Sequence, residues 1–189
     1  MRIILYIGAS FFLLSCEEEN KNYKSIYDYN SSQITGKETS VKITISKKQE
    51  TVYKVECDSL VNFEENILLF DHVDIEIFNN NVKSTNLFSD KAIITGQVEN
   101  SGKKTNYNFS KSNMIAEGNV VIKSFERDDQ LFTNKIMLYN NNRCNILIDT
   151  TESVTLVSNK DTIRGFGFES DCELKNWEIL KPVGVINKN

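Results

Sequence analysis

The sequence predicts an all-β fold, and two observations carry that prediction. Apolar and polar residues alternate over several segments, for example at Val41, Ile43 and Ile45. A period of two places one side of a segment on an apolar surface and the other side in water or against a second layer. Turn-forming clusters at 79–81, 100–102, 127–129 and 140–142 separate these segments. This rhythm is typical of antiparallel hairpins in a sandwich, a jelly roll or an open sheet.

The chain begins like a secreted protein. Arg2 precedes an apolar stretch from Ile3 to Leu14, which is the pattern of a secretory signal peptide. This stretch is too short to span a bilayer, which needs about 20 apolar residues. Cys16 follows Leu-Leu-Ser, which resembles the bacterial lipobox. We therefore expect residues 1–15 to be removed and Cys16 to carry the lipid anchor; the alternative is an ordinary signal peptide with an incidental cysteine.

Residues 16–40 are expected to form a polar tether, because they lack apolar periodicity. Three tyrosines, Tyr23, Tyr27 and Tyr29, suggest that part of the tether docks, and a fully mobile linker is the alternative. Residues 41–189 are expected to form one domain, since this length buries a core of ordinary size. Pro182, the only proline, lies near its end, where an edge strand tolerates one.

The charge balance argues against nucleic acid as a partner. The full chain has a net charge of −4, and loss of Arg2 with the signal peptide makes the mature chain more negative by one unit. Binding to phosphates needs clustered lysine and arginine. The expected partners are therefore not nucleic acids.

The cysteines and the histidine do not predict a metal or cofactor site. Cys57, Cys144 and Cys172 remain in an oxidising compartment, and an odd number leaves at least one free or paired outside the chain. None lies in a Cys-x-x-Cys pair, and His72 is the only histidine, so metal-ligand spacing is absent. The pattern favours buried, apolar-like cysteines, and their pairing stays open.

The sequence also argues against an enzyme. No Gly-x-Ser-x-Gly elbow and no phosphate-binding glycine loop is present, and Gly165-Phe166-Gly167 is too short a signal. His72 follows Asp71 before an expected strand, which favours a loop hydrogen bond over a catalytic dyad. The remaining candidate carboxylates lie beside turns or on alternating faces, where we expect them to be solvated; they are Asp74, Asp90 and Asp171.

Two local patterns refine the strand prediction. Residues 93–98 and 115–120 share Ile-x-x-Gly-x-Val, and a glycine at the same place in two strands suggests a repeated bend or bulge. Gly96 and Gly118 are those glycines. A short helix in 64–70 is a weak alternative to a strand.

Several short motifs together resemble LptC, the periplasmic component of the lipopolysaccharide exporter. They begin with Gly118-Asn119-Val120 at a strand start and Leu131-x-Thr133 at the next. Val154-x-Leu156 and Gly165-x-Gly167-Phe168-x-Ser170-Asp171 follow in order. Leu174-x-x-Trp177-x-Ile179 and Gly184-Val185-Ile186 close the chain. Upstream, Val82-x-Ser84 and Leu87-x-Ser89-Asp90-x-Ala92 fit the preceding strand pair, so the resemblance covers roughly residues 50–186.

The resemblance implies a twisted β-jellyroll of antiparallel strands that is open along one side. It implies a carrier that receives lipopolysaccharide from an LptBFG-type inner-membrane transporter and passes it to an LptA-like bridge protein. The transporter's ATPase drives this transfer, so the chain itself hydrolyses nothing. Many relatives use a transmembrane helix, whereas this chain is expected to hold the periplasmic face of the inner membrane through Cys16. That departure leaves the choice of membrane open.

Two sets of residues are candidates for this role. The expected lipid-binding residues come from the two apolar segments that follow the second glycine motif; they are Ile115, Val120, Ile122, Leu131, Ile136 and Leu138. The bulge at Gly118 can flip the alternation, so the inward faces stay open. The resemblance assigns partner docking to the last strand, at Trp177, Ile179, Val183 and Val185. The alternative function is a structural or assembly lipoprotein whose filled core binds no lipid.

Overall fold

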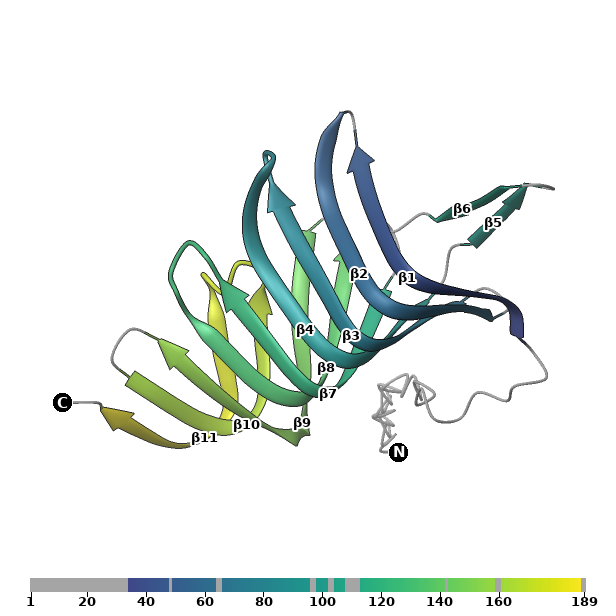
Figure 1. Cartoon of the computed structure of the whole chain (residues 1–189). Coiled ribbons are helices and arrows are strands. Elements are labelled where there is room, and N and C mark those ends of the chain that lie inside the picture. The colour runs from purple at the N-terminus through teal and green to yellow at the C-terminus, as the bar shows by residue number, and fades with distance from the viewer. Residues whose placement is uncertain are drawn as a thin grey trace, which may run out of the picture.

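The fold is an all-β sheet, seen in a computed structural model that describes residues 34–47, 49–63, 66–95, 98–101, 104–107, 113–141, 143–158 and 161–187. Nine strands form one antiparallel sheet in the order β1-β2-β3-β4-β7-β8-β9-β10-β11, and β5 and β6 form a separate hairpin. No helix occurs among the described residues. The sheet is open, because β1 and β11 each have a strand on only one side (Figure 1). The predicted fold class is confirmed.

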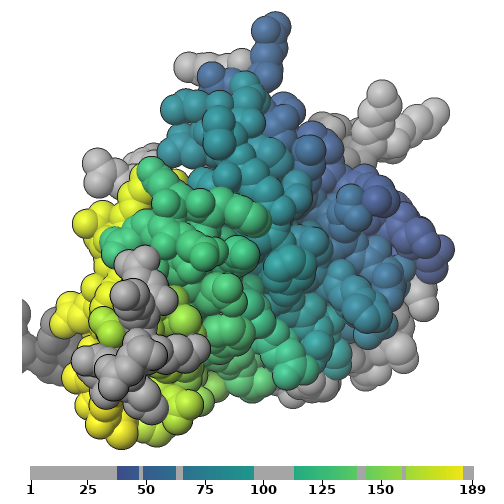
Figure 2. All heavy atoms as spheres, turned by 60° about the vertical axis from the view of Figure 1, so that its left-hand side comes forward, coloured from purple at the N-terminus to yellow at the C-terminus, as the bar shows by residue number. Residues whose placement is uncertain are grey.

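The strands of the main sheet are long and lie side by side in chain order as in a meander, with the β5–β6 hairpin inserted between β4 and β7. Their bounds are β1 Ile34–Lys47, β2 Glu50–Phe63, β3 Asn66–Asn79, β4 Val82–Thr95, β7 Asn113–Ser124, β8 Gln130–Asn141, β9 Arg143–Ser158, β10 Asp161–Asp171 and β11 Trp177–Asn187. The hairpin strands are β5 Val98–Ser101 and β6 Lys104–Tyr107. Figure 2 shows the colours running across one face from blue through green to yellow, as this strand order requires.

A line of bulges crosses the sheet and bends it. The register shifts between Glu56 and Ser59 in β2, and at equivalent places in β3, β4, β7, β8 and β10. Bulges bend a strand and increase its twist. Because most strands are bulged near the middle, the sheet curls around one concave face, and its strands curve strongly in Figure 1.

Left-handed residues form two of these bulges. In β3 they are Asp71 (φ 57°) and His72 (φ 49°), and in β7 they are Gly118 (φ 81°) and Asn119 (φ 46°). The register of β7 against β8 shifts at that point, between Glu117 and Val120. The predicted bulge at Gly118 is therefore confirmed, whereas Gly96 lies outside the described residues.

Two apolar clusters lie on opposite faces of the sheet. The main cluster fills the concave face with side chains from every strand between β1 and β11 and includes Leu60, Ile75 and Phe168. The second cluster is a row of direct register partners on the outer face, formed by Val61, Leu68, Ile93 and Ile115. The core of the fold is thus the space inside the curl.

Two boundary expectations change. The first strand starts at Ile34, so the end of the expected tether belongs to the sheet, paired with β2. The expected short helix at 64–70 is wrong where the structure describes it: residues 66–70 open β3, and Ile67, Leu68 and Leu69 are all buried. Apolar contacts on both faces of the sheet explain this continuous apolar run.

The expected signal peptide, Cys16 and residues 17–33 of the tether lie outside the described residues. Within the described residues, no helix is long and apolar enough to cross a membrane.

Gly118→Ala should destabilise the fold. A Cβ atom there would lie 2.9 Å from Cβ of Asp90, on a backbone that L side chains rarely adopt. We expect the free energy of unfolding to fall by about 2 kcal/mol. Gly184→Ala is the matched control, because a Cβ there meets nothing within 4 Å. Urea unfolding of both variants measures the difference; equal midpoints would show that the bulge does not require glycine.

Candidate ligand groove

A groove of about 1420 Å³ lies beside the core. It opens between the ends of β2 and β3 on one side and β8–β11 on the other. Its lining residues from β2 and β3 are Val52, Tyr53, Ile77, Phe78 and Asn79. Across the groove they are Tyr139, Cys144, Asn145, Ile146, Leu147, Glu169, Ser170, Asp171, Glu173, Lys175, Asn176, Trp177 and Glu178.

The floor of the groove is continuous with the main core. Tyr53, Ile77 and Ile146 line the groove and also belong to the main cluster, with 8%, 6% and 2% of their surface exposed. Trp177 packs against the same cluster, and its ring stacks on Phe168 with centroids 6.5 Å apart. An apolar chain in the groove would therefore rest on core side chains.

One polar side chain interrupts this floor. Ser170 lies on β10 between Ile146 of β9 and Trp177 of β11, its direct register partners. Its hydroxyl is buried and has no hydrogen-bond partner among the described residues. Charged and amide side chains surround the mouth, including Glu173, Lys175 and Asn176. An apolar floor under a polar rim suits an amphipathic molecule.

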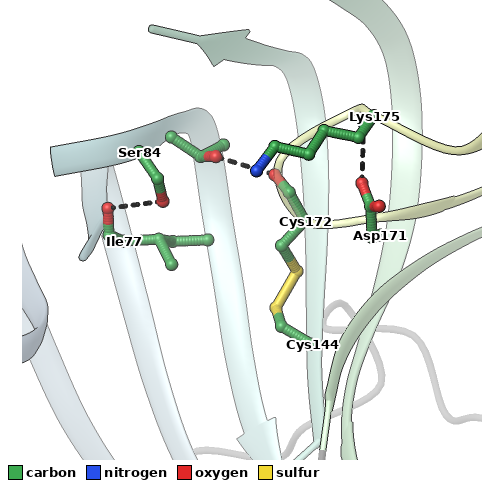
Figure 3. The surroundings of a disulfide bond; sticks show 7 residues. Ile77, Ser84, Cys144, Asp171, Cys172 and Lys175 are labelled. Carbon is green, nitrogen blue, oxygen red and sulfur yellow. Dashed lines mark hydrogen bonds between the residues drawn. A yellow bond between two sulfur atoms is a disulfide. The ribbon is translucent and has the colours of Figure 1, made fainter. Parts of the chain in front are cut away.

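The loop between β10 and β11 borders the groove, and we call residues 172–176 the strap. A disulfide joins Cys172 of the strap to Cys144 at the start of β9, with Cα atoms 5.4 Å apart (Figure 3). Asp171 accepts hydrogen bonds from the backbone N–H of Lys175 and the side-chain amide of Asn176, both at 2.7 Å. These bonds give the strap a defined shape.

The disulfide determines the cysteine pairing that the sequence left open. Cys144 and Cys172 are paired, and 28 positions separate them in the sequence. Cys57 is free and buried, and burial raises the pKa of its thiol to about 11.

Five of the six predicted lipid-binding residues lie together in the main cluster. Their side chains are at most 5% exposed, so they are packed in the core and do not line the groove; they are Val120, Ile122, Leu131, Ile136 and Leu138. Leu138 is nearest to the groove, because it pairs directly with Ile146. Ile115 lies in the second cluster on the outer face, so it shares no surface with the other five. Side chains of β7 still alternate between the two faces across the bulge. Ile115 and Val120 are an odd number of residues apart, so they face opposite sides of the sheet.

The predicted docking strand β11 is an edge strand, as expected. Its residues have different surroundings. Trp177 and Ile179 pack against or within the main core, whereas Val183 is 72% exposed. The backbone of Val185 belongs to β11, and its side chain lies outside the description. Of the three described side chains, only Val183 can meet a partner without disturbing the core.

The groove residues that the sequence did not reveal are Tyr53, Ile77, Ile146 and Ser170. In the sequence, nothing distinguishes these residues from other positions of an alternating strand. The curl of the sheet brings them together, and alternation within one strand gives no measure of that curl.

A second, smaller hollow of about 690 Å³ follows the bulges of β2, β3, β4 and β7. There His72 Nδ1 lies 2.7 Å from the Asp58 carboxylate, and both side chains are exposed. The expected loop hydrogen bond of His72 is thus made to Asp58 of the neighbouring strand, not to Asp71. Asp71 and Asp90 are exposed, while Asp74 and Asp171 are partly buried. No three His, Cys, Asp or Glu side chains of the described chain are placed to hold a metal ion.

A scan of the chain against protein-family models found no match, and a search of curated proteins found none either.

The pKa of His72 should lie above 6.5, because the hydrogen bond and charge of Asp58 favour the protonated ring. His72 is the only histidine, so its ring signals in an NMR titration are unambiguous. Asp58→Asn should lower that pKa. A raised folded-state pKa means that the pair stabilises the fold fully below pH 6.5 and ceases to do so as the pH rises through that pKa. An unchanged pKa in Asp58→Asn would show that the contact does not persist in solution.

Proposed function

We propose that the protein is a lipid-transfer component held at the periplasmic face of the bacterial inner membrane by acylated Cys16. It receives lipopolysaccharide from a membrane transporter and passes it to a periplasmic β-jellyroll bridge. The observation that carries this proposal is the groove, whose apolar floor is an outward continuation of the core. The motif resemblance to LptC and the open all-β sheet support the same reading.

The groove suits transfer rather than storage. Burial of acyl surface contributes about 25 cal/mol per Å² removed from water, so a few methylenes against Tyr53, Ile77 and Ile146 give useful affinity. An open groove leaves the polar head in water and lets the chain leave sideways. The cargo moves only if another component supplies the driving force, which in this proposal is the transporter's ATPase.

The edge strands support the proposed handover. Among the described residues, β1 and β11 each have a strand on one side only, so a row of backbone N–H and C=O groups on the other side can pair with a partner's strand. β11 carries the exposed Val183 beside Pro182, and a proline is tolerated where a ladder ends. An LptA-like partner pairing with β11 would extend the sheet and its concave face.

A specific observation favours the second candidate, a structural or assembly module with a filled core. Five predicted lipid-binding residues are buried, and Leu131 is 0% exposed. A protein of this kind would bind no lipid at any groove position. Lipid binding by the purified protein therefore separates the two candidates.

Val52→Arg should weaken lipopolysaccharide binding without unfolding the protein. Val52 lines the groove, is only partly buried and packs against the main core, so a charge there meets the acyl chain. We expect roughly a tenfold loss of affinity, corresponding to about 1.4 kcal/mol. Val82→Arg is the control, because Val82 is 68% exposed and does not line the groove. Equal weakening by both variants, or no binding by the unmodified protein, would contradict the proposal.

A further inference from the structure

The strap reaches across the mouth of the curled sheet to its other side. The Thr85 hydroxyl of β4 donates a buried hydrogen bond of 2.7 Å to the carbonyl of Cys172. The turn between β7 and β8 meets the strap at two more points. Arg127 donates to the carbonyl of Lys175 at 3.1 Å, and the Lys175 ammonium lies 2.6 Å from the Glu126 carboxylate. The strap thus closes the interior against solvent at this end.

The two ends of the strap are held with different strengths. Cys172 is fixed covalently by its disulfide to Cys144 and is 0% exposed (Figure 3). The contact of Lys175 with Glu126 is an ion pair whose side chains are 41% and 55% exposed. Ion pairs in water contribute little, because solvent screens them and both side chains lose freedom. The end at Lys175 is therefore the end that can be released.

Leu174, between these two ends, is under local backbone strain. Its φ is 57°, a left-handed conformation that is unfavourable for a leucine. Its side chain is nevertheless 0% exposed and belongs to the main cluster, together with Leu131 and Ile136. Burial of this side chain is what offsets the strain. If another apolar group filled the same space, the strap could relax.

We propose that the strap is a lid over the interior and that Leu174 is a plug whose place an acyl chain takes when the lid opens. This inference rests on the proposed lipid transfer and identifies the strap as the segment that controls entry of the lipid. Opening breaks the contacts of Lys175 with Glu126 and Arg127 and the exposed hydrogen bonds of Lys175 and Asn176 to Asp171, while the disulfide keeps Cys172 in place. The buried residues Val120, Ile122, Leu131, Ile136 and Leu138 then become reachable from the groove, which begins at Ile146 beside Leu138.

The test is a chemical cross-link that holds the strap in its closed position. Glu126→Cys and Lys175→Cys are introduced together into the full-length chain carrying Cys16→Ser, and a bismaleimide joins the two new thiols. Cys57 does not compete for the reagent, because it is buried and its pKa of about 11 keeps it protonated. Binding of a fluorescent long-chain fatty acid is measured before and after cross-linking. We expect the locked protein to bind roughly tenfold more weakly than the same variant before cross-linking.

A matched lock away from the mouth is the control. Lys42 and Glu56 form an exposed ion pair of 2.8 Å between register partners on β1 and β2, which are neighbours whether the lid is open or closed. Lys42→Cys with Glu56→Cys, cross-linked in the same way, should leave fatty-acid binding unchanged. A loss in both locked proteins would overturn the lid, because the loss would then not depend on the strap.

The variant Leu174→Ala provides a second test that does not depend on cross-linking. A smaller plug leaves apolar space in the interior, so the fatty acid should bind roughly tenfold more tightly. Unchanged binding in both the locked protein and Leu174→Ala would overturn the lid while leaving lipid transfer through the groove intact. No fatty-acid binding by any of these proteins would overturn the proposed function and the lid together.

Discussion

The line of bulges across the sheet is the constraint on which the other features depend. A flat antiparallel sheet of nine strands would leave one apolar face open to water. Bulges near the middle of most strands curl the sheet, so the concave face buries itself. Left-handed residues such as Gly118 and Asn119 make this bend possible. The groove exists because the curl stays open: within the described part of the chain, the edge strands β1 and β11 do not pair with each other.

The disulfide and the strap hold together strands that the curled sheet leaves unpaired. Hydrogen bonds between neighbouring strands run along the sheet and do not join the β10–β11 loop to β4 or to the β7–β8 turn. The Thr85 bond to Cys172 and the contacts of the β7–β8 turn with Lys175 make that connection. The Cys144–Cys172 disulfide then ties the strap to β9. The strap thus covers the filled interior and also forms one border of the open groove.

Alternation and turn clusters predicted the strands well, because both are local signals. Val120, Ile122, Leu131, Ile136 and Leu138 share the main cluster, but alternation alone could not show this, because bulges interrupt both strands. The sequence left the face of Ile115 open for the same reason, and the structure places it on the outer face. The groove was not predicted, because Tyr53 and Ile146 meet only through the curl of the whole sheet. Cys144 and Cys172 lie next to the register pair Asn145–Asp171 of β9 and β10, and the sequence does not show that register.

Photo-cross-linking in living cells tests directly whether lipopolysaccharide enters the groove. A photoreactive phenylalanine analogue at Trp177, in the groove, is compared with the same analogue at Phe132, which is 39% exposed and does not line the groove. Both positions start from an aromatic side chain, so the substitutions are comparable. We expect lipopolysaccharide adducts at Trp177 and none at Phe132. Adducts at Phe132 alone, or at neither position in a folded protein, would contradict binding of lipopolysaccharide in the groove.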